Sequence, residues 1–473
     1  MRLSPQHWLA LAVVVTVGCS TPDATRPSDP NTGREIDVRP TINTDAVDDD
    51  LDEEATATAT RVDGDRTRAV VYHWNDLATV AVARMGSGPT GLPPYLEANI
   101  YAIANTAMHD ALNSIVPRYK RYAFDGALTP DASSAAAVAQ AAHDALAASL
   151  PPQAAFLDEQ LAATLAAIPA SAGKTGGIAL GSAAAAAVLA TRVNDGSAQA
   201  SIPYTFGTGP GDYRATPPFD GPPFNGFADV PAWGKVRPFV LHSGSQFRAP
   251  PPYGAASNAA AVQTRRYTRD YEEILRLGGV VSARTADQTE IGLFFLENSP
   301  VFWNRIARHL GDQHRLGAWR SARMFALLGL AEGDAYIATF DSKYHYNFWR
   351  PFTATKLADA DGNASTIPDL AWDVLAPPTP PIPDYPSGHG TAGGAAAAVL
   401  SFVFRGDTGP FETTSASLPG VSRRFNSVWD AAWQNADSRV YVGYHFRAAA
   451  EMGTAQGALV GYWAAMHALR RRR

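Results

Sequence analysis

Long stretches rich in alanine and leucine, with apolar residues three and four positions apart, constrain the fold of this chain more than any other feature. This spacing is typical of helices that bury one face. Helical segments are expected at residues 96–116, 135–150, 156–192, 267–277, 285–297, 301–310, 318–346, 389–404, 421–438 and 448–469. Because strand-like alternation is nearly absent, we predict an all-α domain over residues 70–473, built from two packed helical bundles.

A long irregular segment interrupts this helical pattern. Residues 202–253 carry proline and glycine at intervals of a few residues, with many aromatic side chains between them. An irregular stretch of this length inside a folded domain is more often functional or wall-forming than idle. We therefore expect long Pro/Gly-rich loops over one end of the bundles.

The first 69 residues differ in character from the rest. Met1 and Arg2 precede an apolar stretch at 8–17, and Cys19 follows it, which is the layout of a signal peptide over residues 1–19. Residues 16–19 resemble a bacterial lipobox, whose cysteine is acylated and becomes the mature N-terminus, with plain cleavage and an uncleaved anchor as the alternatives. We expect an exported lipoprotein, on the periplasmic side of the outer membrane or at the cell surface, that contacts the membrane only through its lipid anchor. Residues 20–69, which are acidic and rich in threonine, are expected to form a disordered linker.

Charge and cysteine content exclude several classes of protein. Of the 39 Lys and Arg and the 45 Asp and Glu, seven basic and 13 acidic side chains lie in residues 1–69, so the remaining chain is neutral. This balance argues against a nucleic-acid binder, which would show a basic face. A single cysteine excludes a disulfide scaffold, a CxxC redox pair and a thiolate metal site.

Three segments place cationic or imidazole side chains in otherwise apolar helical surroundings. The first runs from a lysine to an arginine seven positions later, a spacing that predicts one shared helix face, and ends at a proline. The second is Pro-Ser-Gly-His at 386–389, which predicts a loop entering a helix N-terminus, and the third is Ser-Arg-x5-His at 438–445. Their chemistry-bearing residues are Lys343, Arg350, Ser387, Gly388, His389, Arg439 and His445.

Together these segments supply what binds a tetrahedral oxyanion. Arginine offers a fork of N–H donors and lysine a point charge, and the amides of a helix N-terminus add further donors. Two histidines allow one to bond the central atom and the other to move protons. Each piece alone is weak, because a Lys and Arg two turns apart are usually a solvated helix face and Pro-Ser-Gly is usually a turn.

The combination resembles the three-part signature of the superfamily that joins vanadium-dependent haloperoxidases with type 2 phosphatidic acid phosphatases and bacterial acid phosphatases. Further stretches, around 95–116, 204–247 and 284–289, look like the bacterial branch of the haloperoxidases, and the resemblance spans roughly residues 70–469. It implies two four-helix bundles, with vanadate held between helices of the second in a site within residues 340–446.

The same resemblance implies a role for each residue of the signature. The residues implied to hold vanadate are Lys343, Arg350, Ser387, Gly388, Arg439 and His445. His445 supplies the nitrogen bound to vanadium, and His389 is the acid-base group. The implied reaction is Lewis-acid activation of hydrogen peroxide by vanadium(V), which oxidises a halide to hypohalous acid for halogenation of small organic acceptors. Neither haem nor a nucleotide is implied as a cofactor.

Residues near the signature leave the halide open. Five positions before the signature serine, fungal chloroperoxidases have Phe and algal bromoperoxidases have His, whereas this chain has Ile382. Phe340 and Trp349 flank the motif as candidates for a halide site, although buried helix aromatics are more often core. His345 and His109 are expected to be structural rather than part of the site.

Three functions are compatible with these residues. The favoured one is an exported vanadate-dependent haloperoxidase. The alternative is a soluble phosphatase, since phosphate is isosteric with vanadate and the pocket offers His445 as nucleophile and His389 as leaving-group acid. A second alternative is a non-catalytic oxyanion-binding envelope protein, although binding alone would not require both histidines. The oligomeric state is open, with a homodimer among the options.

Overall fold

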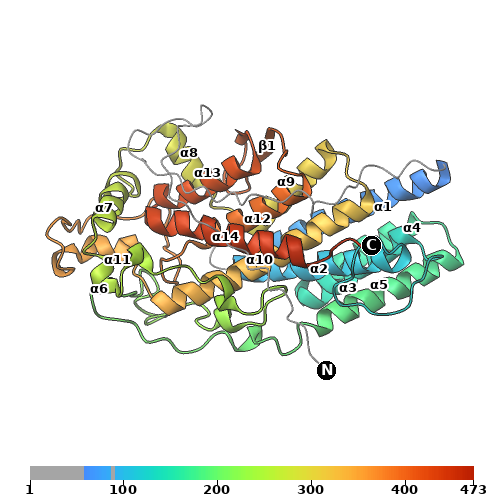
Figure 1. The fold of residues 1–473 in the computed structure, drawn as a ribbon, viewed down its shortest axis with the longest axis horizontal. Coiled ribbons are helices and arrows are strands. Elements are labelled where there is room, and N and C mark those ends of the chain that lie inside the picture. Colours follow the sequence, from blue (N-terminus) through green and yellow to red (C-terminus); the bar gives the residue numbers. More distant parts are fainter. Residues whose placement is uncertain (1–57, 87–90, 473) are drawn as a thin grey trace, which may run out of the picture. The chain divides into compact units, whose positions relative to one another are not determined.

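The structure, a computed structural model, describes residues 58–86 and 91–472 and is mostly helical there, as predicted (Figure 1). Its α-helices are α1 (Thr58–Ala83), α2 (Pro94–Ile115), α3 (Ser134–Ser149), α4 (Ala154–Ala166), α5 (Ala172–Ala190), α6 (Asn258–Ala261), α7 (Arg265–Leu277), α8 (Ala286–Phe294), α9 (Ser299–Gln313), α10 (Ala318–Tyr346), α11 (Pro351–Lys356), α12 (Gly388–Val403), α13 (Val428–Tyr441) and α14 (Arg447–His467). The sheet content of the described residues is one antiparallel pair, β1 (Phe411–Thr414) and β2 (Ser422–Phe425). The expected signal peptide with Cys19 and the expected linker up to residue 57 lie outside the described residues.

The first bundle consists of α1, α2, α3 and α5. Helices α1, α2 and α5 pack around α3, and α1 and α5 also contact α2. On α1, Val71, Trp74 and Ala78 are buried at spacings of three and four, as expected for one apolar helix face. On α5, a Cβ at Gly177 or Gly181 would lie 2.5 Å from a carbonyl oxygen on the α3 side, so these two backbones meet directly. By length and composition, α5 is also the one described helix that could cross a membrane.

The second bundle consists of α10, α12, α13 and α14, with α12 in contact with the other three. Glycines let α12 and α14 approach closely. A Cβ at Gly453, Gly457 or Gly461 of α14 would collide with a carbonyl oxygen of α12 or of its N-cap. This packing of backbone on backbone fixes the N-terminus of α12, which carries the Pro-Ser-Gly-His segment.

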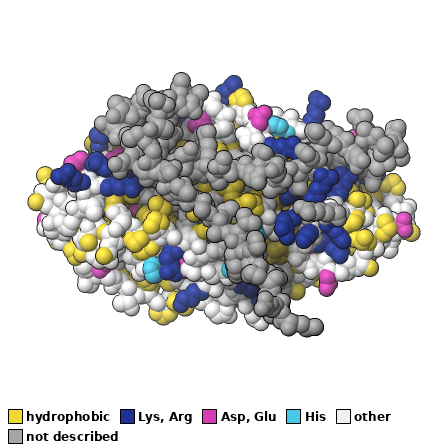
Figure 2. Space-filling model, in the orientation of Figure 1, with side chains coloured by type: hydrophobic (Ala, Val, Ile, Leu, Met, Phe, Trp, Pro, Cys, Tyr) yellow, Lys and Arg dark blue, Asp and Glu magenta, His cyan; other side chains and the backbone are white. Residues whose placement is uncertain are grey.

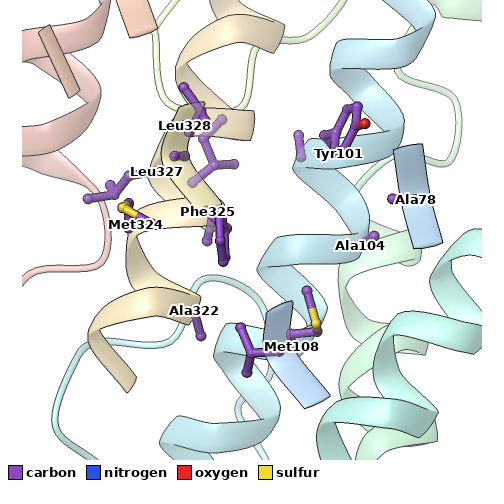
Figure 3. Packing of buried hydrophobic residues seen from close by; sticks show 14 of the residues in the cluster. Ala78, Tyr101, Ala104, Met108, Ala322, Met324, Phe325, Leu327 and Leu328 are labelled. Carbon is purple, nitrogen blue, oxygen red and sulfur yellow. The ribbon is translucent and has the colours of Figure 1, made fainter. Parts of the chain in front are cut away.

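Helix α10 joins the two bundles, because it packs on α2 as well as on α12 and α14. Figure 3 shows Phe325 pointing from α10 toward α2, near Met108. At Gly329 of α10 a Cβ would lie 2.7 Å from the backbone of Ala102 on α2. The long, central helix is therefore held along both sides before it reaches the site at its C-terminal end.

Two buried aspartates hold loops against these helices. Asp110 of α2 accepts hydrogen bonds of 2.7–2.9 Å from the amides of residues 122–124. Asp334 of α10 does the same, at 2.6–2.8 Å, for the amides of residues 239–241 within the long irregular segment. Because each carboxylate satisfies three amides at once, the irregular segment is fixed along α10.

Helix α1 starts earlier than expected, and one predicted helix is divided into two. Helix α1 begins at Thr58, so residues 58–69 are helical rather than part of the predicted linker, and Thr67 is already buried in the bundle. The stretch 156–192 is two helices, α4 and α5, rather than one. Proline follows α4, and the Ser171 hydroxyl caps α5 by accepting a hydrogen bond from the Lys174 amide (3.1 Å).

The stretch 421–438, predicted to be helical, begins instead with β2. Strand β2 pairs with β1 in antiparallel register, with Phe411 opposite Phe425 at one end and Thr414 opposite Ser422 at the other. Helix α13 starts only after Ser427, whose hydroxyl accepts a hydrogen bond from the Asp430 amide (3.2 Å). A short strand with charged residues lacks a clear alternation, so the sequence pattern did not reveal it.

The described C-terminal end pairs with the segment that follows α2. The Lys120 amide donates to the Arg470 carbonyl oxygen (2.8 Å), and the Arg472 amide donates to that of Arg118 (2.9 Å). The side chains of all four residues are exposed. Figure 2 shows Lys and Arg side chains gathered on the face that it draws, near the end marked C in Figure 1.

Candidate active site

Lys343 lies in the last turn of α10 and is fully buried. Its Nζ donates hydrogen bonds to the carbonyl oxygens of Pro383 (2.6 Å) and Asp384 (2.9 Å), in the loop just before α12. Three residues later α10 ends, and Asn347 closes it in the left-handed conformation (φ 52°). The lysine thereby ties the end of α10 to the entry of α12.

Arg350 reaches the site by a route that the sequence did not predict. The chain leaves the helix at Asn347, so Arg350 lies outside α10 and forms the N-cap of α11. Its buried guanidinium donates to the carbonyl oxygens of Ile382 (2.7 Å) and Tyr444 (2.8 Å). The prediction that Lys343 and Arg350 share one helix face is therefore wrong, although both bind the same loop before α12.

The irregular segment supports this turn from outside. The amide of Trp349 donates to the Gly211 carbonyl oxygen, and the amide of Tyr213 donates to that of Asn347, both at 2.8 Å. The Tyr204 hydroxyl donates to the Asn347 side-chain oxygen (2.7 Å). The wall predicted from the Pro/Gly-rich pattern thus braces the backbone that presents Arg350.

Ser387 and Gly388 form the N-terminus of α12. The Ser387 hydroxyl caps the helix by accepting a hydrogen bond from the Gly390 amide (3.3 Å), which leaves its own proton to donate elsewhere. The first amides of the helix, beginning at Gly388, have no intrahelical acceptor. A Cβ at Gly388 would meet one atom within 4 Å, a ring carbon of Tyr336 at 3.7 Å, so the glycine leaves room for a ligand close to the backbone.

Arg439 and His445 come from α13 and the turn that follows it. Arg439 is buried, donates from Nη1 to the Phe295 carbonyl oxygen (3.1 Å), and has an Nε without a hydrogen-bond partner. The amides of Tyr444 and His445 both donate to the Arg439 carbonyl oxygen (3.0 and 3.2 Å), which folds the turn. This fold brings His445 Nε2 to 3.0 Å from Arg350 Nη1.

One residue of the site, Asp384, was missed by the sequence analysis. Its Oδ1 lies 2.8 Å from His445 Nδ1, and both side chains are buried. Its amide donates to the Phe348 carbonyl oxygen (2.9 Å), and its carbonyl oxygen accepts from Lys343. The one signal in the sequence was an acidic residue in the Pro-rich run three positions before Ser387.

The three buried cations, Lys343, Arg350 and Arg439, are called the cation cluster below. Burial, followed by the nearby Arg350, holds the pKa of Lys343 well below its usual value, and burial lowers the pKa of Arg439 to about 10. Burial raises the pKa of Asp384 to about 7, against the effect of Arg350 and Lys343. The positive charges exceed the negative charge of one carboxylate, so the cluster favours an anion.

Both imidazoles of the site are neutral at pH 7. Burial and the charge of Arg350 hold the pKa of His445 well below 6.5. Burial and the charge of Arg439 do the same to the pKa of His389, whose Nε2 lies 3.3 Å from the Glu297 carbonyl oxygen. A neutral imidazole can bind a metal centre or accept a proton, which a protonated one cannot.

These features fit a tetrahedral oxyanion. The buried, unpartnered Nε of Arg439 and the room beside Gly388 provide a donor and space at the N-terminus of α12. Within residues 58–86 and 91–472, no group of three or more His, Cys, Asp or Glu could hold a metal cation. The arrangement offers cationic side chains and backbone amides to oxyanion oxygens, and an imidazole beside them.

Most of the other candidates lie in the core or away from the site. Trp349 belongs to an aromatic core cluster with Tyr267, and His109 is fully buried beside the loop-holding Asp110. His345 is exposed and contacts Tyr346. These three residues therefore have structural rather than catalytic surroundings.

Phe340 and Ile382 form a partial exception. Phe340 is buried in a cluster that also contains Tyr336, and Ile382 packs against that cluster. Tyr336 in turn faces Gly388, and the Ile382 carbonyl oxygen binds Arg350. These two side chains therefore border the site without supplying a polar group to it.

Comparisons with known proteins relate this chain to vanadium chloroperoxidases. Residues 323–473 match the family model of the VCPO second helical-bundle domain. The matched range includes all the candidate site residues from Lys343 to His445. The chain is 26% identical over 283 residues to the vanadium chloroperoxidase of Curvularia inaequalis, in a match that covers 46% of this chain and 45% of that protein. The match thus spans less than half the length of this relative.

Solved structures extend the similarity over most of the chain. A bacterial vanadium-dependent iodoperoxidase superposes with a TM-score of 0.66 at 24% identity, over 87% of this chain and 96% of the other. A holo-type bacterial vanadium-dependent chloroperoxidase superposes with a TM-score of 0.61 at 18% identity, over 81% and 94%. At these identities the superpositions show the fold, and they confirm the predicted helical-bundle architecture. The family model and the chloroperoxidase match support the resemblance predicted from the three-part signature.

Proposed function

We propose that this protein, a relative of the vanadium-dependent haloperoxidases, is itself a vanadate-dependent haloperoxidase that oxidises halide with hydrogen peroxide. The observation that carries the proposal is the cation cluster, buried at the N-terminus of α12 beside two neutral imidazoles. A protein that only bound an oxyanion would need the cations but not both histidines. The paired histidines add a metal ligand and a proton acceptor, which are the requirements of catalysis.

The residues present fit vanadate. Its oxygens would be held by Lys343, Arg350, Arg439, the Ser387 hydroxyl and the Gly388 amide, and its vanadium by His445 Nε2. When bound, vanadate supplies a Lewis acid that activates hydrogen peroxide toward halide. The cations of the chain would absorb the negative charge that develops on oxygen, in a buried site where such interactions are strong.

His389 would serve as the proton acceptor. Its Nε2 faces the Glu297 carbonyl oxygen, so this nitrogen carries the hydrogen and Nδ1 keeps a lone pair. Because burial and the charge of Arg439 hold its pKa well below 6.5, the imidazole is neutral at pH 7 and Nδ1 has a free lone pair. The negative charge of a bound oxyanion would raise this pKa toward the working pH, where proton transfer is efficient. The helix N-terminus also disfavours a lasting positive charge on His389, so the proton is readily passed on.

A phosphatase is the second candidate. Phosphate has the same tetrahedral shape as vanadate, and the cation cluster provides for either ion. The pair formed by Asp384 and His445 also suits a nucleophilic imidazole, since a carboxylate at Nδ1 would orient Nε2 for attack on phosphorus. The two activities differ in their need for vanadate and peroxide.

Two assays on the same preparation separate these functions. Apoprotein is assayed for oxidation of iodide, bromide and chloride with hydrogen peroxide, with and without added vanadate, and for hydrolysis of a phosphomonoester. We expect halide oxidation that needs both vanadate and peroxide and is blocked by excess phosphate. The His345→Ala variant, altered on the exposed face of α10, is the control and should behave like the wild type.

The contrary result is equally clear. Efficient phosphoester turnover that vanadate suppresses, with no halide oxidation at any vanadate concentration, would establish the phosphatase instead. Absence of both activities in a protein that still binds vanadate would favour the non-catalytic binding protein.

We also propose that the protein acts outside the cytoplasm as a lipoprotein, from the apolar stretch at 8–17 and Cys19. Mature protein should begin at Cys19, carry lipid and leave the membrane fraction after Cys19→Ser. Unlipidated protein with an intact N-terminus from the native host would contradict this proposal.

A further inference from the structure

We propose that Asp384 is a positioning residue that holds His445 in the tautomer with hydrogen on Nδ1, so that Nε2 keeps the lone pair needed to bind the central atom of the oxyanion. The expected effect on vanadate binding rests on the proposed function. The choice of tautomer stands on the contacts of His445 alone.

Both neighbours of the imidazole select the same tautomer. At Nδ1 the partner is Asp384 Oδ1, 2.8 Å away, which accepts a hydrogen. Arg350 Nη1, which can only donate, lies nearer to Nε2 (3.0 Å) than to Nδ1 (3.4 Å), and Nδ1 already has the closer carboxylate partner. An acceptor at one nitrogen and an obligate donor at the other leave Nδ1 protonated and Nε2 unprotonated. Second-sphere carboxylates orient metal-binding histidines in this way in other proteins.

The position of the carboxylate is fixed independently of the histidine. The Asp384 amide donates to the Phe348 carbonyl oxygen, and its own carbonyl oxygen accepts from Lys343 Nζ, both at 2.9 Å. These main-chain bonds remain when the side chain is changed. A variant at this position therefore alters the carboxylate while keeping the loop that holds Lys343 and Arg350.

A competing explanation is that Asp384 only balances the charge of the cation cluster. The two explanations differ in what asparagine can replace. Asn keeps an oxygen that accepts from His445 Nδ1 but carries no charge, whereas Ala removes both. If the residue selects the tautomer, Asn should rescue most of the function that Ala loses; if it only balances charge, Asn and Ala should behave alike.

The test uses the full apoprotein in four forms: wild type, Asp384→Asn, Asp384→Ala and the control Asp270→Asn. Asp270 is another buried carboxylate whose burial raises its pKa to about 7, but it accepts from the Ala448 amide (2.8 Å) and the Tyr253 hydroxyl (3.0 Å) rather than from a histidine. Nitrogen NMR of ¹⁵N-histidine-labelled protein reports the tautomer of His445, identified by its loss in His445→Gln. Calorimetric titration with orthovanadate reports affinity.

We expect the Nδ1–H tautomer in the wild type, in Asp384→Asn and in Asp270→Asn, and a shift toward Nε2–H in Asp384→Ala. Vanadate affinity should fall roughly 10- to 100-fold in Asp384→Ala and by much less in Asp384→Asn. An Nε2–H tautomer in the wild type, or equal losses in the Asn and Ala variants, would overturn the inference. If the tautomer follows Asp384 but the wild type binds no vanadate, the positioning pair stands and the proposed function fails.

Discussion

Helix α10 carries buried acidic side chains at one level and a buried basic side chain at another, and burial affects the charge of the two groups differently. Glu332 faces Glu97 of α2, and these two residues are called the carboxyl cluster here. Neither oxygen of Glu332 has a hydrogen-bond partner, whereas one oxygen of Glu97 accepts from Asn298 (2.8 Å). Burial raises the pKa of Glu332 well above its usual value and that of Glu97 to about 7.

Eleven residues further along the same helix, Lys343 enters the cation cluster. Its three members bind backbone carbonyl oxygens, and the two guanidinium groups stay charged at neutral pH. A buried carboxyl group can lose its charge by taking up a proton, but a guanidinium cannot lose its charge in the same pH range. The cation cluster therefore needs an anion, and the carboxyl cluster does not need a cation. This difference is why we propose the cation cluster, and not the carboxyl cluster, as a binding site.

The largest expected effect concerns the chemistry next to the cation cluster. His389→Ala should retain bound vanadate but lose halide oxidation by roughly 10²- to 10⁴-fold, the usual cost of a missing acid-base group. Steady-state rates and the vanadium content of the same samples check this, with His345→Ala as the matched control. Loss of vanadate together with activity would show that His389 belongs to the binding set instead.

Removal of one charge should separate the two clusters directly. Arg350→Ala or Arg439→Ala should weaken vanadate binding by about 2–5 kcal/mol, because oxyanion charge is left unpaired in a buried site. Glu332→Gln should leave vanadate affinity within about threefold of the wild type, since burial favours the neutral form of Glu332. Calorimetric titration of the three variants with orthovanadate measures these affinities. Equal effects of the arginine and glutamate changes would remove the distinction between the clusters.

A third change tests the packing that presents the cation cluster. Gly457→Ala places a methyl group against the Thr391 carbonyl oxygen of α12, so we expect a loss of stability of about 1–3 kcal/mol. Gly64→Ala in α1, where no atom lies within 4 Å of the added Cβ, is the control and should be neutral or gain up to about 1 kcal/mol. Urea unfolding measures both. An unchanged midpoint for Gly457→Ala would mean that α12 and α14 can separate without cost.

The smallest effect should appear in the carboxyl cluster, as a dependence of stability on pH. Because the pKa of folded Glu332 is raised, the stabilisation from its neutral form is complete below the unfolded pKa near 4.3 and is lost as the pH rises toward the folded pKa. The wild type should lose up to about 1.4 kcal/mol per pH unit relative to Glu332→Gln in that window. Urea unfolding at pH 5, 6 and 7 measures the difference. A wild-type stability that stays constant or rises relative to that of Glu332→Gln as the pH increases would contradict a protonated Glu332.

The sequence predicted which residues meet in the site better than how the chain brings them there. Helix periodicity located most helices, and α10 has the predicted bounds. The convergence of Lys343 and Arg350 was expected from one helix face, but it arises because Asn347 ends the helix in a left-handed turn. A local pattern does not show where a helix stops when the stop depends on support from a distant loop, here through Tyr204 and Tyr213.

Asp384 shows a second limit of prediction from the sequence. An isolated acidic residue in a Pro-rich loop is usually exposed, so its sequence context gives no sign that it is buried beside a histidine 61 positions away. Burial of such a carboxylate depends on the tertiary arrangement of Lys343 and Arg350 around it. The strand β2 was missed for a related reason, since its pairing with β1 lies outside the reach of helix periodicity.

The central claim is that the buried cation cluster and His445 bind one tetrahedral oxyanion. Titration of the apoprotein with orthovanadate, followed by calorimetry and vanadium analysis after desalting, tests it most directly. We expect one vanadate per chain in the wild type and in His345→Ala, displaced by excess phosphate, and no vanadate retained by His445→Ala. A wild type that retains no vanadate, or a His445→Ala variant that retains as much as the wild type, would contradict it.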